Sequence, residues 1–380
     1  LQYRIGSITK TLTAVALLQL REQGRVGLND TLESHLAGRG YPAATLRALL
    51  SHSAGLPSEP AGAWWERNPG RSHAELVEHL LDEPAPFPPG ATFHYTNVAY
   101  ALLGEVVARV SGAGWWDTVR ERILAPLGMD RTTYLPAAPH ATGFSVHPYA
   151  GTLTPEPAYD SGAMAPAGQL WSTVADLARY AAFLAAGHDD VLPLRVLEEM
   201  TTPQSGSLAS AASGGYGLGL RLVRGGSGLL VGHTGSMPGF LASLFVDRGR
   251  RTGAVLLANA TTGLAPESAA VELLELLERC EPTVTPAWSP PETVPAAVEA
   301  VLGPWYWGNT ALLFGWDGTE VVVTDLKGEV EFGFRPESDA TFLGTRGYHH
   351  GERLRVEPLP GGASRLVCAT FVFTRAPYAD

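Results

Sequence analysis

The 380-residue chain is almost without lysine: among its 27 basic residues only Lys10 and Lys327 are lysines, and the rest are arginines. Arginine stays protonated in proteins and cannot act as a base, whereas a buried lysine can lose its proton. The formal net charge is −11, and no block rich in lysine or arginine is present. This charge balance argues against a nucleic-acid partner.

Cysteine, metal-ligand spacings and long apolar runs are also scarce. Cys280 and Cys368 lie far apart and outside any redox or metal-ligand spacing, so they could pair or stay free. The 11 histidines match no recognised ligand spacing, which argues against a metallohydrolase, and we expect neither metal nor cofactor. No apolar run could span a bilayer, and no charged leader precedes a cleavage site. Because the first residue is Leu1, we expect an N-terminal truncation, and the compartment stays unknown.

The most informative stretch lies at the start of the chain, where Lys10 follows Ser7 by three residues. An apolar run predicts a buried helix over 8–23, so the amine and the hydroxyl project from one face. A neutral amine within hydrogen-bond reach can take the serine proton during attack on a carbonyl. Burial and the positive end of the helix dipole both disfavour the ammonium form. A snorkelling surface lysine is the weaker alternative.

Two further polar groups stand beside predicted elements. Tyr95 and Asn97 precede an apolar helix predicted over 98–110, and residues two apart in an extended segment face the same way. Taken alone, an N-cap asparagine beside a core tyrosine explains them. His52 lies in the turn-forming stretch 51–57, and we expect it to hold loop carbonyls rather than act as a base.

The pattern then changes from helix to strand. In order, it predicts a strand at 216–223, a turn at 224–228, a strand at 229–236, strands at 240–246 and 253–258, and a helix at 267–279. We therefore predict an α/β protein of the α+β type, with an antiparallel sheet flanked by helices and a helical lobe. It would occupy 1–280, followed by a proline-rich linker at 281–298 and an all-β, barrel-like domain at 299–380.

Three motifs in this order carry a family resemblance: Ser7-Ile8-Thr9-Lys10, Tyr95-Thr96-Asn97 and His233-Thr234-Gly235. Together they resemble the active-site motifs of the penicillin-recognising serine hydrolases, and most closely the class C β-lactamase and D-alanyl-D-alanine carboxypeptidase group. The likeness spans roughly 1–279 and implies a β-lactamase/transpeptidase-like fold. The C-terminal module is similar to lipocalin-like appendages of such hydrolases.

The resemblance implies a role for each motif residue. Ser7 would be the acylated nucleophile, and Lys10 its base or the group that keeps the base deprotonated. Tyr95 would pass a proton to the leaving group and activate water, with its pKa lowered by Lys10. Asn97 would bind the amide of the acyl side chain.

The remaining predicted residues would bind the substrate. His233, Thr234 and Gly235 would line the strand edge on which the substrate docks. The backbone N–H groups of Ser7 and Ser236 would form an oxyanion hole, worth about 3 kcal/mol per donor. Arg221 would bind a terminal carboxylate, although a solvated strand end is the simpler interpretation.

Two departures from the family pattern stand out. His233 replaces the lysine of many relatives, which weakens the attraction for a carboxylate at neutral pH. Relatives also build two strands from residues ahead of the serine, whereas this chain begins just before Ser7. We expect a small-molecule or short-peptide substrate, namely a D-amino-acid peptide, a β-lactam or a carboxylic ester. A non-catalytic ligand-binding homologue is the alternative.

Overall fold

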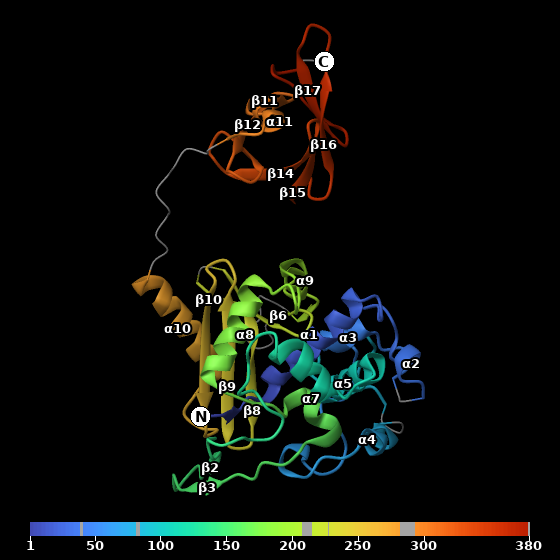
Figure 1. Cartoon of the computed structure of the whole chain (residues 1–380), viewed down its shortest axis with the longest axis vertical. Coiled ribbons are helices and arrows are strands. Elements are labelled where there is room, and N and C mark those ends of the chain that lie inside the picture. The colour runs from blue at the N-terminus through green and yellow to red at the C-terminus, as the bar shows by residue number, and fades with distance from the viewer. Residues whose placement is uncertain (39–40, 81–83, 207–214, 227, 282–292, 379–380) are drawn as a thin grey trace. The chain divides into compact units, whose positions relative to one another are not determined.

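The computed structural model describes residues 1–38, 41–80, 84–206, 215–226, 228–281 and 293–378 (Figure 1). The chain divides into two compact units, Leu1–Thr283 and Val284–Asp380. Most of the linker predicted at 281–298 lies outside the described residues, and the last part of it forms helix α11 (Ala296–Glu299). Within the described ranges, no helix is long and apolar enough to cross a membrane.

The first unit has mixed α/β content, as predicted. Its helices are η1 (Gly6–Ile8), α1 (Thr9–Glu22), α2 (Leu32–His35), α3 (Leu46–Leu50), η2 (Trp65–Arg67), α4 (His73–Leu80), α5 (Asn97–Ser111), α6 (Trp115–Val119), η3 (Arg120–Leu124), η4 (Gly162–Met164), α7 (Ala165–Gly168), α8 (Val174–Ala186), α9 (Leu194–Met200) and α10 (Pro266–Cys280). Its strands are β1 (Tyr3–Arg4), β2 (Phe144–Val146), β3 (Leu153–Pro155), β4 (Trp171–Ser172), β5 (Ser205–Gly206), β6 (Gly215–Tyr216), β7 (Arg221–Arg224), β8 (Leu229–Met237), β9 (Phe240–Asp247) and β10 (Thr252–Ala258).

The main sheet has six antiparallel strands in the order β10-β9-β8-β7-β6-β5, which confirms the predicted meander. Every residue of β9 is buried, so helices must cover both faces of this strand. Phe245 packs with Ala270 and Leu274 of α10, whereas its neighbours Leu244 and Val246 join the core that contains α8. Since successive strand residues point to opposite faces, α8 and α10 cover opposite faces of the sheet (Figure 1).

The single strand predicted at 216–223 is wrong. The structure has two short strands, β6 and β7, which pair with each other antiparallel as Tyr216 with Arg221. Gly217 and Gly219 make this turn, because a Cβ at Gly217 would lie 1.9 Å from the carbonyl oxygen of Met200, and Gly219 has φ +81°. The alternation of apolar residues continues through the turn, so the sequence pattern predicted one strand where the chain forms a tight hairpin.

The helical lobe predicted between Ser7 and the strands is confirmed, with α1 packed against α5 and α7. Helix α1 is buried at every position from Thr9 to Leu20, which explains its nearly continuous apolar sequence. Thr96 caps α5 by accepting from the backbone N–H of Ala99, and Gly112 ends the helix in the left-handed region at φ +78°.

The second unit is an eight-stranded antiparallel sheet in sequential order. Its strands are β11 (Gly303–Trp307), β12 (Thr310–Trp316), β13 (Val321–Thr324), β14 (Val330–Ser338), β15 (Thr341–Gly347), β16 (Arg353–Pro358), β17 (Ser364–Cys368) and β18 (Phe371–Phe373). Backbone hydrogen bonds of 2.8 and 2.9 Å between Tyr306 and Thr374 join its two edges. The sheet is thus nearly closed, as the barrel-like expectation required, and the lipocalin likeness stays a prediction.

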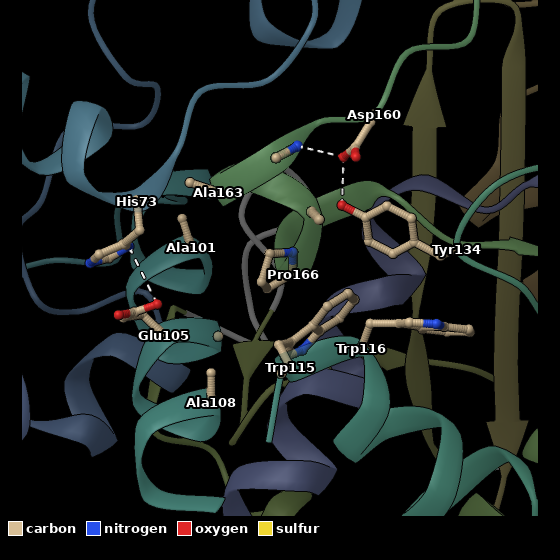
Figure 2. A pocket seen from close by; sticks show the side chains of 14 residues that line it. His73, Ala101, Glu105, Ala108, Trp115, Trp116, Tyr134, Asp160, Ala163 and Pro166 are labelled. Atoms are coloured by element: carbon tan, nitrogen blue, oxygen red, sulfur yellow. Dashed lines mark hydrogen bonds and ion pairs between the residues drawn. The ribbon is translucent and has the colours of Figure 1, made fainter. Parts of the chain in front are cut away.

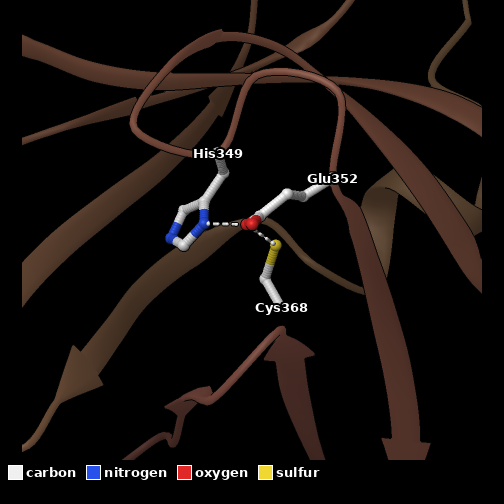
Figure 3. A group of neighbouring side chains, drawn as sticks. All are labelled: His349, Glu352 and Cys368. Carbon is white, nitrogen blue, oxygen red and sulfur yellow. Dashed lines mark hydrogen bonds and ion pairs between the residues drawn. The ribbon is translucent and has the colours of Figure 1, made fainter.

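Three polar side chains of the second unit lie together: the buried His349 and Cys368, and Glu352, whose side chain is partly exposed (Figure 3). Nδ1 of His349 lies 2.7 Å from Oε2 of Glu352, and the Sγ atom of Cys368 lies 3.6 Å from the same oxygen. Burial raises the pKa of the Cys368 thiol to about 12, so the thiol keeps its proton and donates to the carboxylate. Both cysteines are free, Cys280 on the surface and Cys368 in the interior.

The contact between α5 and α7 generates a prediction about stability. A Cβ at Gly104 would lie 2.1 Å from Cγ of Pro166. Alanine favours a helix over glycine by about 1 kcal/mol, but overpacking a buried contact costs about 1–3 kcal/mol. We expect Gly104→Ala to lower the free energy of unfolding by about 1 kcal/mol in chemical denaturation. Gly104→Ala in a Pro166→Ala background should cost less, and an equal cost in both backgrounds would contradict this packing.

Candidate active site

Ser7 and Lys10 meet as the sequence predicted. Ser7 lies in η1, one turn ahead of Lys10 at the start of α1, and Nζ of Lys10 lies 2.8 Å from Oγ of Ser7. Lys10 is completely buried, so the alternative of a snorkelling surface lysine is wrong. Its amine also donates to Oδ1 of Asn97 at 2.6 Å and to the carbonyl oxygen of Ala167 at 2.8 Å.

These three partners determine what the amine can do. Asn97 Oδ1 and the Ala167 carbonyl can only accept, so they take two N–H groups of Lys10 whatever its charge. The remaining tetrahedral position of Nζ faces Ser7. In the ammonium form this position donates to the hydroxyl, and in the neutral form it holds the lone pair that can accept the hydroxyl proton. The neutral amine is therefore aimed at Ser7.

As the sequence predicted, the ammonium form of Lys10 is disfavoured by burial. Burial lowers the pKa of Lys10 from 10.5 to about 7, against the opposing effect of Glu59 and Glu66, whose negative charges raise it. Near neutral pH a substantial fraction of the protein thus has a neutral amine beside Ser7, which is the state that general-base catalysis needs.

Two glycines allow η1 to lie directly against β8. Gly6 has φ +51°, and a Cβ there would lie 2.6 Å from the backbone nitrogen of Ser236. A Cβ at Gly235 would lie 1.9 Å from the carbonyl oxygen of Ile5 and 3.3 Å from the backbone nitrogen of Ser7. The backbones around Ser7 and Ser236 are therefore close neighbours, which is the arrangement that a two-donor oxyanion hole requires.

The segment with Tyr95 and Asn97 is fixed by hydrogen bonds to the loop that contains His52. The backbone N–H of Thr96 donates to Nδ1 of His52 at 3.1 Å, and the Thr96 hydroxyl donates to the carbonyl oxygen of Pro57 at 2.6 Å. Burial lowers the pKa of His52 well below its usual range, so its ring is neutral. His52 has a structural role as expected, although its ring accepts from a backbone amide and does not hold a carbonyl.

Asn97 is buried, and both ends of its amide are engaged. Its Oδ1 accepts from Lys10, and its Nδ2 donates to Oε1 of Glu59 at 2.6 Å. The other carboxylate oxygen of Glu59 accepts from Nε1 of Trp65 at 2.7 Å. Glu59 thus fixes which way the Asn97 amide points. The predicted contact of Asn97 with substrate stays a prediction.

Tyr95 lies beside Ser7 and hydrogen-bonds to it. Burial raises the pKa of Tyr95 well above its usual range, and the hydrogen bond from Ser7 opposes this only in part. The expectation that Lys10 lowers the pKa of Tyr95 is therefore wrong. Nζ of Lys10 lies 5.0 Å from the centre of the ring, but an amine with a pKa near 7 carries only part of a positive charge at neutral pH. Tyr95 is a phenol in the resting protein.

Six of the nine predicted site residues line a cavity of about 220 Å³, together with Tyr216, which was not predicted; Lys10, Asn97 and Gly235 are not part of its lining. Its walls are Ser7, Tyr95, Tyr216, Arg221, His233, Thr234 and Ser236. His233 contacts the Tyr216 hydroxyl through Nε2 at 2.9 Å, and burial lowers the pKa of His233 to about 3. His233 is therefore uncharged, and this wall lacks the cation that a lysine would supply. Gly235 lies in β8 between Thr234 and Ser236.

Arg221 forms an ion pair with Glu267, the second residue of α10. Nε of Arg221 donates to Oε2 of Glu267, and Nη2 donates to Oε1 at 3.1 Å. Sequence reasoning missed both Glu59 and Glu267. Their partners are 38 and 46 residues away along the chain, and no local pattern connects them.

A larger cavity of about 410 Å³ lies apart from this site, between α5, α6 and α7 (Figure 2). Trp115, Trp116 and Pro166 form much of its wall, and none of the predicted site residues lines it. Its connection to the site is indirect. Pro166 precedes Ala167, whose carbonyl accepts from Lys10.

Comparison with known proteins identifies the family of the first unit. The family model described as Beta-lactamase matches residues 1–278, and the model described as Domain of unknown function (DUF7586) matches residues 294–375. A beta-lactamase-like protein of Homo sapiens is 30% identical over 322 residues, which is 77% of this chain and 61% of that protein. The D-alanyl-D-alanine-carboxypeptidase/endopeptidase AmpH of Escherichia coli is 34% identical over 35% of this chain and 37% of its own length. The chain thus spans less than two thirds of these curated relatives.

Among solved structures, a D-stereospecific amidohydrolase from Streptomyces sp. superposes with a TM-score of 0.60 at 28% identity. The match covers 75% of this chain and 87% of that one. The octameric penicillin-binding protein homologue from Pyrococcus abyssi has a TM-score of 0.65 at 24% identity, over 98% of this chain and 88% of its own. The second likeness shows the fold alone.

The buried amine predicts an unusual dependence of stability on pH. The unfolded chain binds a proton at Lys10 up to about pH 10.5, whereas the folded chain releases it above about pH 7. Lys10 therefore destabilises the fold below this window, and wild-type stability should rise across it by up to about 1.4 kcal/mol per pH unit relative to Lys10→Met. Chemical denaturation at several pH values measures this difference.

Lys327→Met is the matched control, since Lys327 is the other lysine of the chain and is exposed in the second unit. This control should show no such relative change with pH. A constant difference in stability between wild type and Lys10→Met from pH 7 to 10 would contradict the lowered pKa.

Proposed function

The chain belongs to the beta-lactamase family, and on that premise we propose that it is a serine hydrolase that cleaves an amide or ester through an acyl-enzyme on Ser7. The observation that carries the proposal is the buried Lys10 amine, whose third position faces Ser7 while Asn97 and Ala167 take the other two. This arrangement supplies a nucleophile and its base in contact at rest.

Acylation uses both groups in contact with Ser7. The Ser7 oxygen attacks the substrate carbonyl, and its proton passes to the neutral amine of Lys10. The backbone N–H groups of Ser7 and Ser236 hold the negative oxygen of the tetrahedral intermediate. When this intermediate collapses, the leaving group departs with the proton of the Tyr95 hydroxyl. The acyl-enzyme then has an ammonium at Lys10 and a phenolate at Tyr95.

Deacylation returns both protons. The Tyr95 phenolate takes a proton from water, and the hydroxide adds to the ester of Ser7. As this second intermediate collapses, the Ser7 oxygen leaves and recovers a proton from the Lys10 ammonium. The raised pKa of Tyr95 fits this sequence, because a phenolate formed only during turnover is a strong base.

For the substrate, we propose a D-amino-acid peptide or amide, with β-lactams and carboxylic esters as the other classes. The proposal is supported by the names of two similar proteins, a D-alanyl-D-alanine-carboxypeptidase/endopeptidase and a D-stereospecific amidohydrolase. The cavity of about 220 Å³ is suited to a small molecule or the end of a short peptide.

Exchange of the nucleophile tests the proposed function. We expect wild-type protein to form a covalent adduct with a fluorophosphonate probe, and Ser7→Ala to form none, because the Ser7 oxygen is the attacking atom. Intact-protein mass spectrometry measures the adduct, and a parallel incubation with a penicillin tests β-lactam recognition. Ser145→Ala, which changes a serine of β2 outside the cavity lining, is the control. Adducts that persist in Ser7→Ala, or no adduct with either probe in wild type, would contradict the mechanism.

The pKa of Lys10 predicts the pH dependence of the labelling reaction. Only the neutral amine can accept the Ser7 proton, so the labelling rate should rise with pH and level off above about pH 7. Glu59→Gln removes a charge that raises this pKa, so the rise should move to lower pH by a few tenths of a unit. Glu75→Gln, which changes an acidic residue of α4 bonded to Ser72, should leave the midpoint in place. A shift of the Glu59→Gln midpoint to higher pH would contradict the assignment of the base.

A further inference from the structure

The ion pair between Arg221 and Glu267 lies beside the cavity that contains Ser7, and it affects which leaving groups the proposed site can accept. We propose that Glu267 is a specificity-determining residue: it occupies Arg221 with an internal carboxylate, so that the site acts on substrates whose leaving group has no carboxylate of its own. Among the proposed substrate classes, this favours D-amino-acid amides and esters over peptides that end in a free carboxylate and over penicillins. This inference rests on the proposed function and gives Arg221 a different role from the substrate-carboxylate contact expected from the sequence.

Arg221 is placed to affect the leaving group. It lines the cavity of about 220 Å³ together with Ser7, and it also lines a neighbouring cavity of about 300 Å³ together with Glu267. Thr234 belongs to both walls as well. The Arg221 guanidinium therefore stands between the nucleophile and α10, where a substrate portion that extends beyond the scissile bond along β8 would pass.

Glu267 binds Arg221 in the way a substrate carboxylate would. Two carboxylate oxygens accept from Nε and Nη2 of one guanidinium edge, which is the bidentate geometry that arginine forms with carboxylates. The side chains are 21% and 28% exposed, so the pair is only partly screened by water. A carboxylate on the substrate would therefore approach a guanidinium whose charge is already balanced by Glu267 and whose Nε and Nη2 donors already have an acceptor.

No other cationic side chain among the described residues of these walls could bind a substrate carboxylate in place of Arg221. Among the described residues that line the two cavities, the basic side chains are Arg221 and His233. His233 is uncharged near neutral pH, because burial lowers its pKa to about 3. Lys10 lies beneath Ser7 and is fully buried behind the cavity wall.

The fold holds Glu267 in place. Glu267 is in the first turn of α10, directly after Pro266, where a negative side chain interacts favourably with the helix dipole. Farther along α10, Ala270 and Leu274 pack against Leu230 and Phe245 of the sheet. Because the helix is anchored, its carboxylate competes for Arg221 without the loss of freedom that a substrate would undergo.

A pair of aryl esters tests this proposal. Both carry the same phenylacetylglycyl group, and the leaving phenol bears either a carboxylate or a carboxamide in the meta position. The measured quantity is the ratio of kcat/KM for the carboxylate ester to that for the carboxamide ester. Comparing this ratio between variants cancels the difference in leaving-group basicity. We expect Glu267→Gln to raise the ratio about tenfold over wild type, and Glu267→Gln with Arg221→Ala to abolish the gain.

Glu278→Gln is the matched control, since Glu278 also joins α10 to an arginine, Arg250, at 3.1 Å but lies outside both cavity walls. It should leave the ratio at the wild-type value. An unchanged ratio in Glu267→Gln, or a rise that survives removal of Arg221, would overturn the inference while leaving the serine mechanism intact. If neither ester acylates Ser7 in rapid-quench mass spectrometry, the proposed function fails, and this inference fails with it.

Discussion

The burial of one amine organises the first unit of this protein. Removing an ammonium ion from water is costly, and Lys10 meets that cost by shifting toward its neutral form and by satisfying each position of its nitrogen. Its three partners come from η1, α5 and α7. The same three contacts that make burial tolerable also leave the lone pair facing Ser7, so stability and reactivity depend on one geometry.

Such a geometry requires close approach of several backbones, and glycine supplies it. Gly6 and Gly235 bring η1 onto β8, and Gly104 lets α5 approach Pro166 in α7. On the far side, His52 and Pro57 fix the backbone before α5. These contacts fix the positions of the elements that surround Lys10 and Ser7. The reactive pair is thus held by the rigid elements of the lobe and the sheet.

The sequence predicted best what depends on local spacing. Residues three apart lie on one face of a helical turn, so Ser7 of η1 and Lys10 of α1 could be paired without knowledge of the fold. The alternation of apolar residues likewise gave β8, β9 and β10, but it joined β6 and β7 into one strand because two glycines can turn a chain without breaking the pattern. Bringing Tyr95 and His233 to the same cavity needed the family resemblance.

The sequence alone could not show which charged side chains approach the site from distant parts of the chain. These side chains affect the pKa of Lys10 and the partner of Arg221. Glu59 reaches Asn97 from an unrelated loop, and Glu267 reaches Arg221 from a helix that pattern reasoning identified only as a helix. Together with Glu66, Glu59 raises the pKa of the buried amine, so acidic residues between α3 and α4 affect the pH at which Lys10 loses its proton. Glu267 and the neutral His233 leave the walls of the two neighbouring cavities close to uncharged. For the proposed function, we therefore expect recognition to rely on backbone hydrogen bonds along β8 and on shape, which favours a substrate with a polar but uncharged chain beyond the scissile bond.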